Sequence, residues 1–394
     1  MSHRKTLLAA LLGCAVPLLV SAAEWPQWRG PDGQGHIAGS GYPLTWSETE
    51  NVVWKTEIPG RGHSSPVVDG NQVWITSAID APISEEKRQA KLKANTGNQP
   101  LTLVGELSLR AVCVDRATGK LIHDIEVTTD DDPDWTHQIN TFASPSPVLE
   151  DGRLYCCFGA HGSGCVDTQT GKVVWTNKEL KIQHENGPGS SPVIWGDLYI
   201  VHCDGSDKQY VAALNKRTGQ LAWKTPRSGA MNENPQLRKA YGTPLVARLG
   251  GRDQLLSPGA DWLYSYDPAT GEELWKLNYE TLGFSIVPRP VVHGDMIYMS
   301  TSFMRPHILG IRVDAAGGAP KVAWRYDKAG PQIPSPILVG DALYFVNDKG
   351  VATCLDAKTG ELHWEARLGG NFAASPSLAD GRLYFHNRDG KTFV

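Results

Sequence analysis

The sequence predicts an all-β fold in which one four-stranded unit is repeated around a ring. Two short phrases recur along the chain and alternate with each other. The first phrase is D-x-x-T-G-x-x-x-W with variants, and its six copies end at His123, Trp175, Trp223, Trp275, Trp324 and Trp364. These ends are 40 to 52 residues apart, which is the length of one β-propeller blade with its loops. The chain of 394 residues also exceeds the size of an ordinary single core.

The second phrase is a proline-containing dipeptide followed by apolar residues and a Gly/Asp turn. It reads PSPVLEDG at 145–152 and PSPILVGD at 334–341, and seven copies occur between residues 64 and 381. The order within a blade is therefore innermost strand, turn, second strand, loop, third strand, D-x-x-T-G turn and outer strand. Proline suits the start of an innermost strand, because such a strand is a sheet edge and proline cannot donate to a ladder.

The repeated turn has a structural reason. The Asp side chain caps the turn, and Gly adopts the positive φ that a short hairpin with a bulge requires. The flat ring four residues later can pack between neighbouring blades while its indole N–H finds a carbonyl. We expect this docking role for one aromatic residue per blade: Trp54, Trp175, Trp223, Trp275, Trp324 and Trp364. His123 and Asn215 depart from the phrase, as do two extra residues between Asp314 and Trp324.

Two incomplete units stand at the ends of the repeat array. Residues 51–58 (NVVWKTEI) have the pattern of an outer strand without the strands that should precede it. Residues 374–394 contain the inner strands of a blade without an outer strand. Together they predict a seventh blade closed by a three-plus-one seal, which leaves no open sheet edge. The alternative is an eight-bladed ring, in which this chain stops early and lacks about one blade.

The N-terminus has the pattern of a secretory signal. Residues 1–23 contain a basic start, an apolar run and small residues before a cleavage point, and no later segment could cross a bilayer. We therefore expect a periplasmic or secreted protein with a Trp-rich strap over residues 24–50 and a propeller over residues 51–394. Lipidation at Cys14 is less favoured, because the apolar run continues beyond it. The net charge of −4 and the lack of a basic stripe argue against a nucleic-acid partner.

These repeats resemble a known family. The phrase A-x-D-x-x-T-G-x-x-x-W is similar to the tryptophan-docking repeat of the pyrroloquinoline quinone (PQQ) enzymes, from about Asn51 to the C-terminus. The same repeat occurs in cofactor-free PQQ-like propellers, including the scaffold lipoprotein of the outer-membrane β-barrel assembly machinery. The opening EWPQWRGPDGQG resembles the start of secreted bacterial PQQ-like propeller proteins. The resemblance implies the fold, often with eight blades, but is compatible with a dehydrogenase or a scaffold.

Polar side chains precede the innermost strand in every repeat. On a propeller these loops surround one end of the central channel, where ligands usually bind. We expect the following residues near that funnel: Arg61, His63, Asn140, His184, Glu185, Asn186, Lys239, Tyr241, Arg289, Gln332 and Asn371. They could hold a peptide or a cofactor, although a wet, hydrogen-bonded channel mouth is the plainer interpretation. A protein or extended polypeptide is the partner that we expect.

A quinoprotein would need more than this funnel. The PQQ enzymes that the repeats resemble use Ca²⁺ and a catalytic Asp beside the quinone. Glu185 and Asn186 are suitable oxygen donors, but no matching Asp can be identified. Some of these enzymes have adjacent cysteines over the quinone. Here Cys156 and Cys157 lie within a predicted strand, where neighbouring side chains point to opposite faces and a disulfide is disfavoured.

Other motifs carry weaker predictions. DDDPDW (130–135) spaces its carboxylates like a calcium loop but lacks the Gly and the final Glu of an EF-hand, so we expect a solvated acidic loop. No zinc-ligand spacing occurs among the His and Cys residues. Cys113, Cys165 and Cys354 stand two residues before a turn Asp, which indicates a cramped core position. Residues 79–107 are a polar insertion, expected at the surface with a helical turn or two.

The sequence thus favours an extracytoplasmic propeller that acts as an interaction scaffold, with no cofactor and no catalysis of its own. The first alternative is an oxidoreductase that depends on PQQ and Ca²⁺. A second alternative is a module that binds carbohydrate or another ligand through exposed rings, for which Trp25, Trp28 and Trp135 are candidates.

Overall fold

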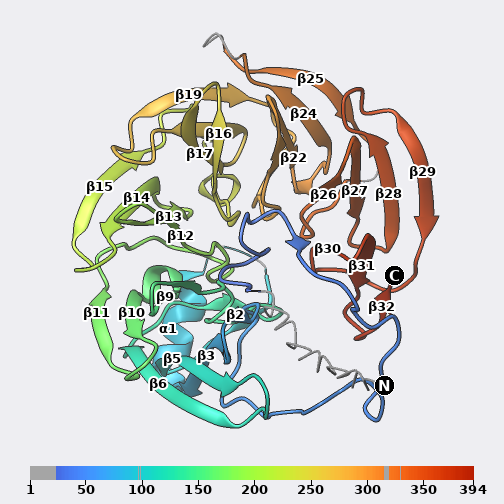
Figure 1. Ribbon diagram of the computed structural model, residues 1–394. Coiled ribbons are helices and arrows are strands. Elements are labelled where there is room, and N and C mark those ends of the chain that lie inside the picture. The colour runs from blue at the N-terminus through green and yellow to red at the C-terminus, as the bar shows by residue number, and fades with distance from the viewer. Residues whose placement is uncertain (1–23, 96, 98, 315–318, 329) are drawn as a thin grey trace, which may run out of the picture.

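Seven four-stranded sheets surround a central axis like the blades of a propeller (Figure 1). The predicted fold class is confirmed. This computed structural model describes residues 24–95, 97, 99–314, 319–328 and 330–394, so the predicted signal of residues 1–23 lies outside the described residues. In the described part of the chain, no helix is long and apolar enough to span a membrane.

The first six blades follow the chain, and their strands are antiparallel from the axis to the rim. Blades 1 to 3 consist of β2 (Val67–Asp69), β3 (Gln72–Ala81), β5 (Glu106–Asp115) and β6 (Leu121–Asp130); β8 (Val148–Glu150), β9 (Arg153–Cys157), β10 (Ser163–Asp167) and β11 (Val173–Asn177); and β12 (Val193–Trp195), β13 (Leu198–Asp204), β14 (Gln209–Asn215) and β15 (Leu221–Pro226). Blades 4 to 6 consist of β16 (Leu245–Leu249), β17 (Arg252–Pro258), β18 (Trp262–Tyr266) and β19 (Glu273–Asn278); β21 (Val291–His293), β22 (Met296–Ser300), β24 (Ile308–Arg312) and β25 (Lys321–Tyr326); and β26 (Ile337–Val339), β27 (Ala342–Val346), β28 (Val351–Asp356) and β29 (Leu362–Arg367).

The last blade takes its fourth strand from the N-terminal segment, at the axis. β1 (His36–Ile37) runs parallel to β30 (Ser377–Ala379), and β31 (Arg382–His386) and β32 (Thr392–Phe393) follow outward. The predicted outer strand at residues 51–58 is wrong, because these residues form no strand. Blade 1 holds them instead: Trp54 donates to the Arg116 carbonyl and Thr56 donates to the Gly119 carbonyl.

The D-x-x-T-G turns are built as the sequence predicts in the five copies that the structure describes. In the turn after β10, Asp167 Oδ1 accepts hydrogen bonds from the Thr170 N–H at 2.7 Å and from its hydroxyl at 2.8 Å, while Gly171 has a φ of 71°. The ladder shifts just before the turn and places Cys165 directly opposite Trp175. The same small-residue position faces the ring in the other blades: Cys113, Ala213, Ser265, Gly310 and Cys354.

The rings of the outer strands pack onto the turn of the next blade. Trp175 covers Gly219, where a Cβ atom would come within 2.6 Å of the ring, and its indole N–H donates to the Lys216 carbonyl at 2.8 Å. Trp54, Trp223 and Trp324 make the same two kinds of contact, and His123 occupies the equivalent place against Gly171. Two rings differ: Trp275 donates to Gln254 of its own blade at 2.8 Å, and Trp364 is 43% exposed.

Short elements decorate the loops between second and third strands and between blades. α1 (Glu85–Ala94) lies in the predicted polar insertion; Ser84 caps it by accepting from the Lys87 N–H at 3.3 Å, and none of its residues is buried. The other short elements are β4 (Leu101–Thr102) paired with β7 (Thr136–His137), β20 (Gly283–Phe284) paired with β23 (Phe303–Met304), and the 3₁₀ helices η1 (Gly159–His161) and η2 (Pro235–Leu237). In a meander of this order all these loops share one end of the ring, which we call the funnel face.

Candidate functional site

A ring of hydrogen bonds lines the channel where the innermost strands begin. The residue before the recurring proline supplies a hydroxyl in six blades: Ser65, Ser146, Ser191, Thr243, Ser335 and Ser375. Five of these hydroxyls accept the N–H of the equivalent residue in the preceding blade, at 2.8–2.9 Å. In the remaining blade Arg289 replaces the hydroxyl. The recurrence of Ser or Thr before proline was the signal for this ring, which the sequence prediction did not include.

The N-terminal strap crosses the channel and binds the far ends of the innermost strands (Figure 1). Pro26 accepts the Leu149 N–H at 2.7 Å, Gln34 accepts the Val292 N–H at 2.8 Å, and His36 donates to the Leu338 carbonyl at 2.8 Å. The innermost strands run from the funnel loops, past the hydroxyl ring, to these contacts. The strap therefore forms a floor at the end of the ring opposite the funnel face, and we call the part of the ring between this floor and the funnel face the cup.

Four predicted funnel residues come together between blades 2 and 4. Tyr241 donates its hydroxyl proton to the His184 carbonyl at 2.5 Å and accepts from the Asn186 side-chain amide at 3.1 Å. Glu185 lies between them in the chain, is buried, and has a φ of 65°. Its carboxylate accepts from the Ser206 hydroxyl at 3.0 Å. The four side chains thus bind the loops to one another.

His184 is neutral in the folded protein. Its Nε2 accepts the Ala160 N–H at 2.9 Å, so its proton is on Nδ1, which has no partner among the described residues. Burial lowers the pKa of His184 to about 3. Burial also lowers the pKa of Lys239, whose ammonium group donates to Gln236 at 2.6 Å. Neither group is presented to the mouth of the cup as a free charge.

Other predicted residues lie on the opposite side of the funnel, toward blades 1, 6 and 7. The surrounding loops partly desolvate the His63 imidazole and lower its pKa, and the positive charges of Arg388 and Arg61 lower it further, so these three groups are neighbours. Asp348 accepts the Gln332 N–H at 2.6 Å, and burial raises the pKa of this carboxyl group. The side chains of Arg61, His63 and Asn371 are exposed, and none forms a hydrogen bond within the described part of the chain.

Arg289 is not at the funnel mouth. Its backbone N–H belongs to the hydroxyl ring, and its side chain extends below that ring, where Nε donates to the Pro244 carbonyl at 3.1 Å. Nη1 donates to the carbonyls of Trp28 and Gly33 in the strap, both at 3.3 Å. Arg289 therefore fixes the floor of the cup and does not face a ligand in its opening.

The residues suited to PQQ and Ca²⁺ do not converge. Glu185 directs its carboxylate to Ser206, whereas Asn186 directs its amide to Tyr241. In the described part of the chain, no group of three or more His, Cys, Asp or Glu side chains is placed to hold a metal ion. The donor set that the sequence suggests therefore does not fit a Ca²⁺ ion beside a quinone, and we derive no step through this cofactor.

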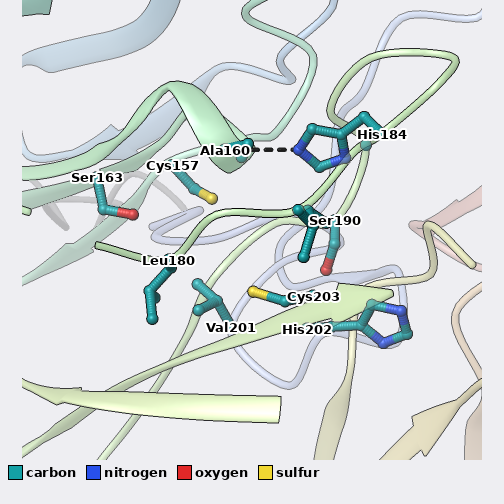
Figure 2. A pocket seen from close by; sticks show the side chains of 12 residues that line it. Cys157, Ala160, Ser163, Leu180, His184, Ser190, Val201, His202 and Cys203 are labelled. Carbon is teal, nitrogen blue, oxygen red and sulfur yellow. Dashed lines mark hydrogen bonds between the residues drawn. The ribbon is translucent and has the colours of Figure 1, made fainter. Parts of the chain in front are cut away.

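A small cavity lies between blades 2 and 3 (Figure 2). Cys157, Cys203, His184, His202 and Ser190 are among its lining residues. Its volume of about 20 Å³ accommodates a single water molecule and excludes a quinone. Burial raises the pKa of both Cys157 and Cys203, so these thiols remain protonated and weakly nucleophilic. All six described cysteines are free, which includes the adjacent Cys156–Cys157 pair.

A buried polar network between blades 3 and 4 has the composition of a hydrolytic triad. His202 Nδ1 lies 3.0 Å from the Ser257 hydroxyl, and His202 Nε2 lies 3.3 Å from Asp204 Oδ2. Ser257 has no exposed surface, and Arg227 donates both to its hydroxyl at 2.8 Å and to Asp204 at 3.0 Å. A substrate cannot reach this serine, so the network joins the two blades. His202 and Asp204 share β13, whereas Ser257 lies on β17 and Arg227 follows β15, so no local sequence spacing indicates the whole network.

Two further predictions have clear outcomes. The acidic loop lines an open pocket of about 210 Å³, where Asp130 contacts His161 at 2.9 Å and Asp132 contacts Lys91 at 3.0 Å, so its charges are partly paired. None of the three rings proposed for carbohydrate binding is fully exposed: Trp28 is half-buried, with the Arg289 guanidinium group 6.0 Å from its ring centroid. Trp135 is buried, and Trp25 packs on Gly30 of the strap, while its backbone pairs with Val68.

Comparisons with known proteins agree with the propeller. The profile of the family described as outer membrane protein assembly factor BamB matches residues 44–225, 98–309, 207–341 and 259–394. BamB of Burkholderia pseudomallei is 24% identical over 359 residues, which are 86% of each chain. BamB of Yersinia pestis is 25% identical over 256 residues, so the match covers 59% of each chain, less than two thirds of that relative. Tetrathionate hydrolase of Acidithiobacillus ferrooxidans is 21% identical over 86% of this chain and 66% of its own.

Solved structures share the fold at low identity. BamB from Moraxella catarrhalis superposes with a TM-score of 0.54 and 18% identity, covering 74% of this chain and 80% of its own. A europium-containing methanol dehydrogenase superposes with a TM-score of 0.52 and 13% identity, covering 94% and 88% of the two chains. These likenesses show the propeller fold alone. The family profile, in contrast, spans most of the sequence, and the chain therefore belongs to the family of outer membrane protein assembly factor BamB.

Proposed function

We propose that this protein is an extracytoplasmic scaffold that binds an extended polypeptide on its funnel face and performs no catalysis of its own. The observation that carries the proposal is the composition of that face. It combines exposed apolar side chains on the loops, from Ile139, Phe303 and Met304, with the exposed polar side chains of Arg61, His63 and Asn371. An extended polypeptide with alternating apolar and polar side chains can contact the apolar residues through its apolar side chains and the polar residues through its backbone N–H and C=O groups.

The family supports the same direction. Relatives at 24–25% identity are named for outer membrane protein assembly, and we carry over from that name a polypeptide partner outside the cytoplasm. The secretory signal predicted at residues 1–23 supports such a location. Peripheral association with the outer membrane follows from the same proposal.

The quinoprotein alternative rests on the methanol dehydrogenase likeness, which concerns the fold. Thermal melting with PQQ and Ca²⁺ tests it directly, because a ligand at one hundred times its dissociation constant stabilises the folded state by about 2.7 kcal/mol. We expect no rise in melting temperature. A rise that Glu185→Ala abolishes would establish a quinoprotein.

Fluorescence anisotropy with a labelled peptide of alternating apolar and polar residues tests the scaffold. The variant Phe303→Ser/Met304→Ser removes two exposed apolar side chains from the funnel face and should weaken binding about tenfold, since each group contributes up to ~1 kcal/mol. Leu362→Ser is the matched control, because Leu362 is 43% exposed, close to the 47% of Phe303, but lies on the outer strand β29. Equal affinity of all three proteins, or no binding by the parent, would contradict the proposal.

A further inference from the structure

Two arginine side chains are buried together in the channel, at the floor of the cup. Arg29 belongs to the strap and is 4% exposed, and Arg289 belongs to blade 5 and is 2% exposed. Arg29 Nη2 donates to the carbonyls of Gln34 and Pro336, both at 2.7 Å. Among the described residues, the Arg289 side chain also donates to backbone carbonyls alone. Neither guanidinium group forms an ion pair within the described part of the chain.

The hydrogen-bonding capacity of Arg29 is largely unused. Its Nε and Nη1, which together carry three N–H bonds, are buried and meet no acceptor among the described residues. Native proteins rarely leave such groups unpaired, and an ion or a water molecule is the common explanation when a structure shows them. The loss of folding stability is larger for a charged donor, because an unpaired buried charge destabilises a fold far more than an unpaired neutral group does.

The charges around the pair do not balance. The residues whose charges act on Arg29 are Arg289, which repels it, and Asp32. Asp32 is held elsewhere: its carboxylate accepts the Gln34 N–H at 2.8 Å and contacts His36 at 3.3 Å. Two arginines and one aspartate leave a net charge of +1 when His36 is neutral. The hydrogen bond to Asp32 raises the pKa of His36, and protonation of His36 would add a further positive charge. Burial in this cationic group lowers the pKa of Arg29 to about 9.

We propose that the floor of the cup binds a small monovalent anion, of the halide class, between the strap and blade 5. The N–H bonds of Nε and Nη1 point to different sides of the Arg29 guanidinium group, so one of these two groups donates to the anion, and Arg289 supplies the second positive charge. A water molecule could satisfy the donors but would leave the charge unbalanced. A second carboxylate from the chain would balance the charge, but no carboxylate other than that of Asp32 is close enough to affect either arginine among the described residues.

The site has a structural consequence. Arg289 stands at the only position of the hydroxyl ring that has no hydroxyl, and it binds the strap instead. An anion shared by Arg29 and Arg289 therefore joins residues 260 positions apart in the sequence. We expect docking of the strap, and with it the stability of the whole ring, to depend on the halide concentration.

Thermal melting at constant ionic strength tests this site. The parent protein should melt about 2 °C higher in chloride or bromide than in gluconate, which is too large an anion for a closed channel. Arg29→Met should abolish this difference. Arg61→Met, which removes an exposed arginine on the funnel face, is the matched control and should retain it. Equal melting of the parent in all three salts, or a halide response that persists in Arg29→Met, would overturn the proposal.

A crystal grown in bromide gives an independent readout if Arg29→Met fails to fold. Anomalous scattering from the parent should show one bromide within hydrogen-bonding distance of Arg29 Nε or Nη1. Arg29→Lys keeps a positive charge but removes the guanidinium donors, and the bromide peak should disappear in crystals of that variant. Absence of a peak beside Arg29 in the parent would show that the donors are hydrated or that the side chain is rearranged, and either result overturns the site.

Discussion

Truncating Trp175 should destabilise the protein far more than truncating Trp364, although both residues close the same repeated phrase. Trp175 is 7% exposed, packs on Gly219, donates to the Lys216 carbonyl at 2.8 Å and meets Tyr199 edge-on at 5.7 Å. Trp364 is 43% exposed and makes no such hydrogen bond among the described residues. Trp175→Ala should therefore lower the free energy of unfolding by ~3–5 kcal/mol. Trp364→Ala should lower it by ~1 kcal/mol or less.

Urea denaturation followed by circular dichroism measures both values. A double-mutant cycle adds a second test of the geometry. In Gly219→Ala the new Cβ atom comes within 2.6 Å of the Trp175 ring and the backbone keeps a φ of 72°, so the substitution causes both a clash and backbone strain. In the Trp175→Ala background only the strain remains, and the two changes should be non-additive. Equal losses for Trp175→Ala and Trp364→Ala, or strict additivity with Gly219→Ala, would refute docking between blades as the role of these rings.

Two further predictions concern histidines. Burial lowers the pKa of His184 to about 3 and that of His202 to about 4, from an ordinary value of 6.5, so the unfolded chain binds protons more readily than the folded chain. The contribution of these two neutral histidines to the free energy of unfolding should be fully present above pH 6.5 and should decrease as the pH falls from 6.5 toward 3. Urea denaturation at several pH values measures this dependence, and His184→Gln should make it less steep. An unchanged pH dependence in His184→Gln would contradict a neutral His184. His123→Trp should leave the melting temperature unchanged or raise it, because His123 already occupies a tryptophan slot over Gly171 and stacks on Trp74 at 5.6 Å; a large fall would mean that the slot is specific for imidazole.

The blades could be predicted from the sequence because their determinants are local. The turn Asp, the Thr three residues later, the Gly with positive φ and the aromatic residue all lie within nine positions, and each acts through the backbone beside it. A single copy such as 167–175 thus contains all the residues that determine its turn and the strand that follows. The small residue opposite the ring, Cys165 in that copy, is also near in sequence, since the ladder places it directly across a hairpin.

The site could be predicted only in part, because its contacts join distant segments. The loop residues His184, Glu185 and Asn186 are neighbours in sequence, and their grouping with Tyr241 follows from adjacent blades. Ser206 binds the Glu185 carboxylate and Ala160 binds the His184 ring, so these two side chains are not available to a ligand. No sequence motif indicates either contact. The closing strand at residues 51–58 was wrong for a similar reason. Its pattern is that of an outer strand, but the acceptors for Trp54 and Thr56 lie in blade 1.

Departures from a repeat are informative where the structure assigns them a different partner. Six positions before the recurring proline carry Ser or Thr, and each link in the hydroxyl ring joins one blade to the next. Arg289 has no hydroxyl to accept the N–H of the preceding blade, so that hydrogen bond of the ring is missing. Its longer side chain donates instead to two carbonyls of the strap. Gly33 permits this approach, since a Cβ atom there would collide with the guanidinium group. Arg289 in the repeat and Gly33 in the strap are therefore both needed for the contact that fixes the strap to the ring.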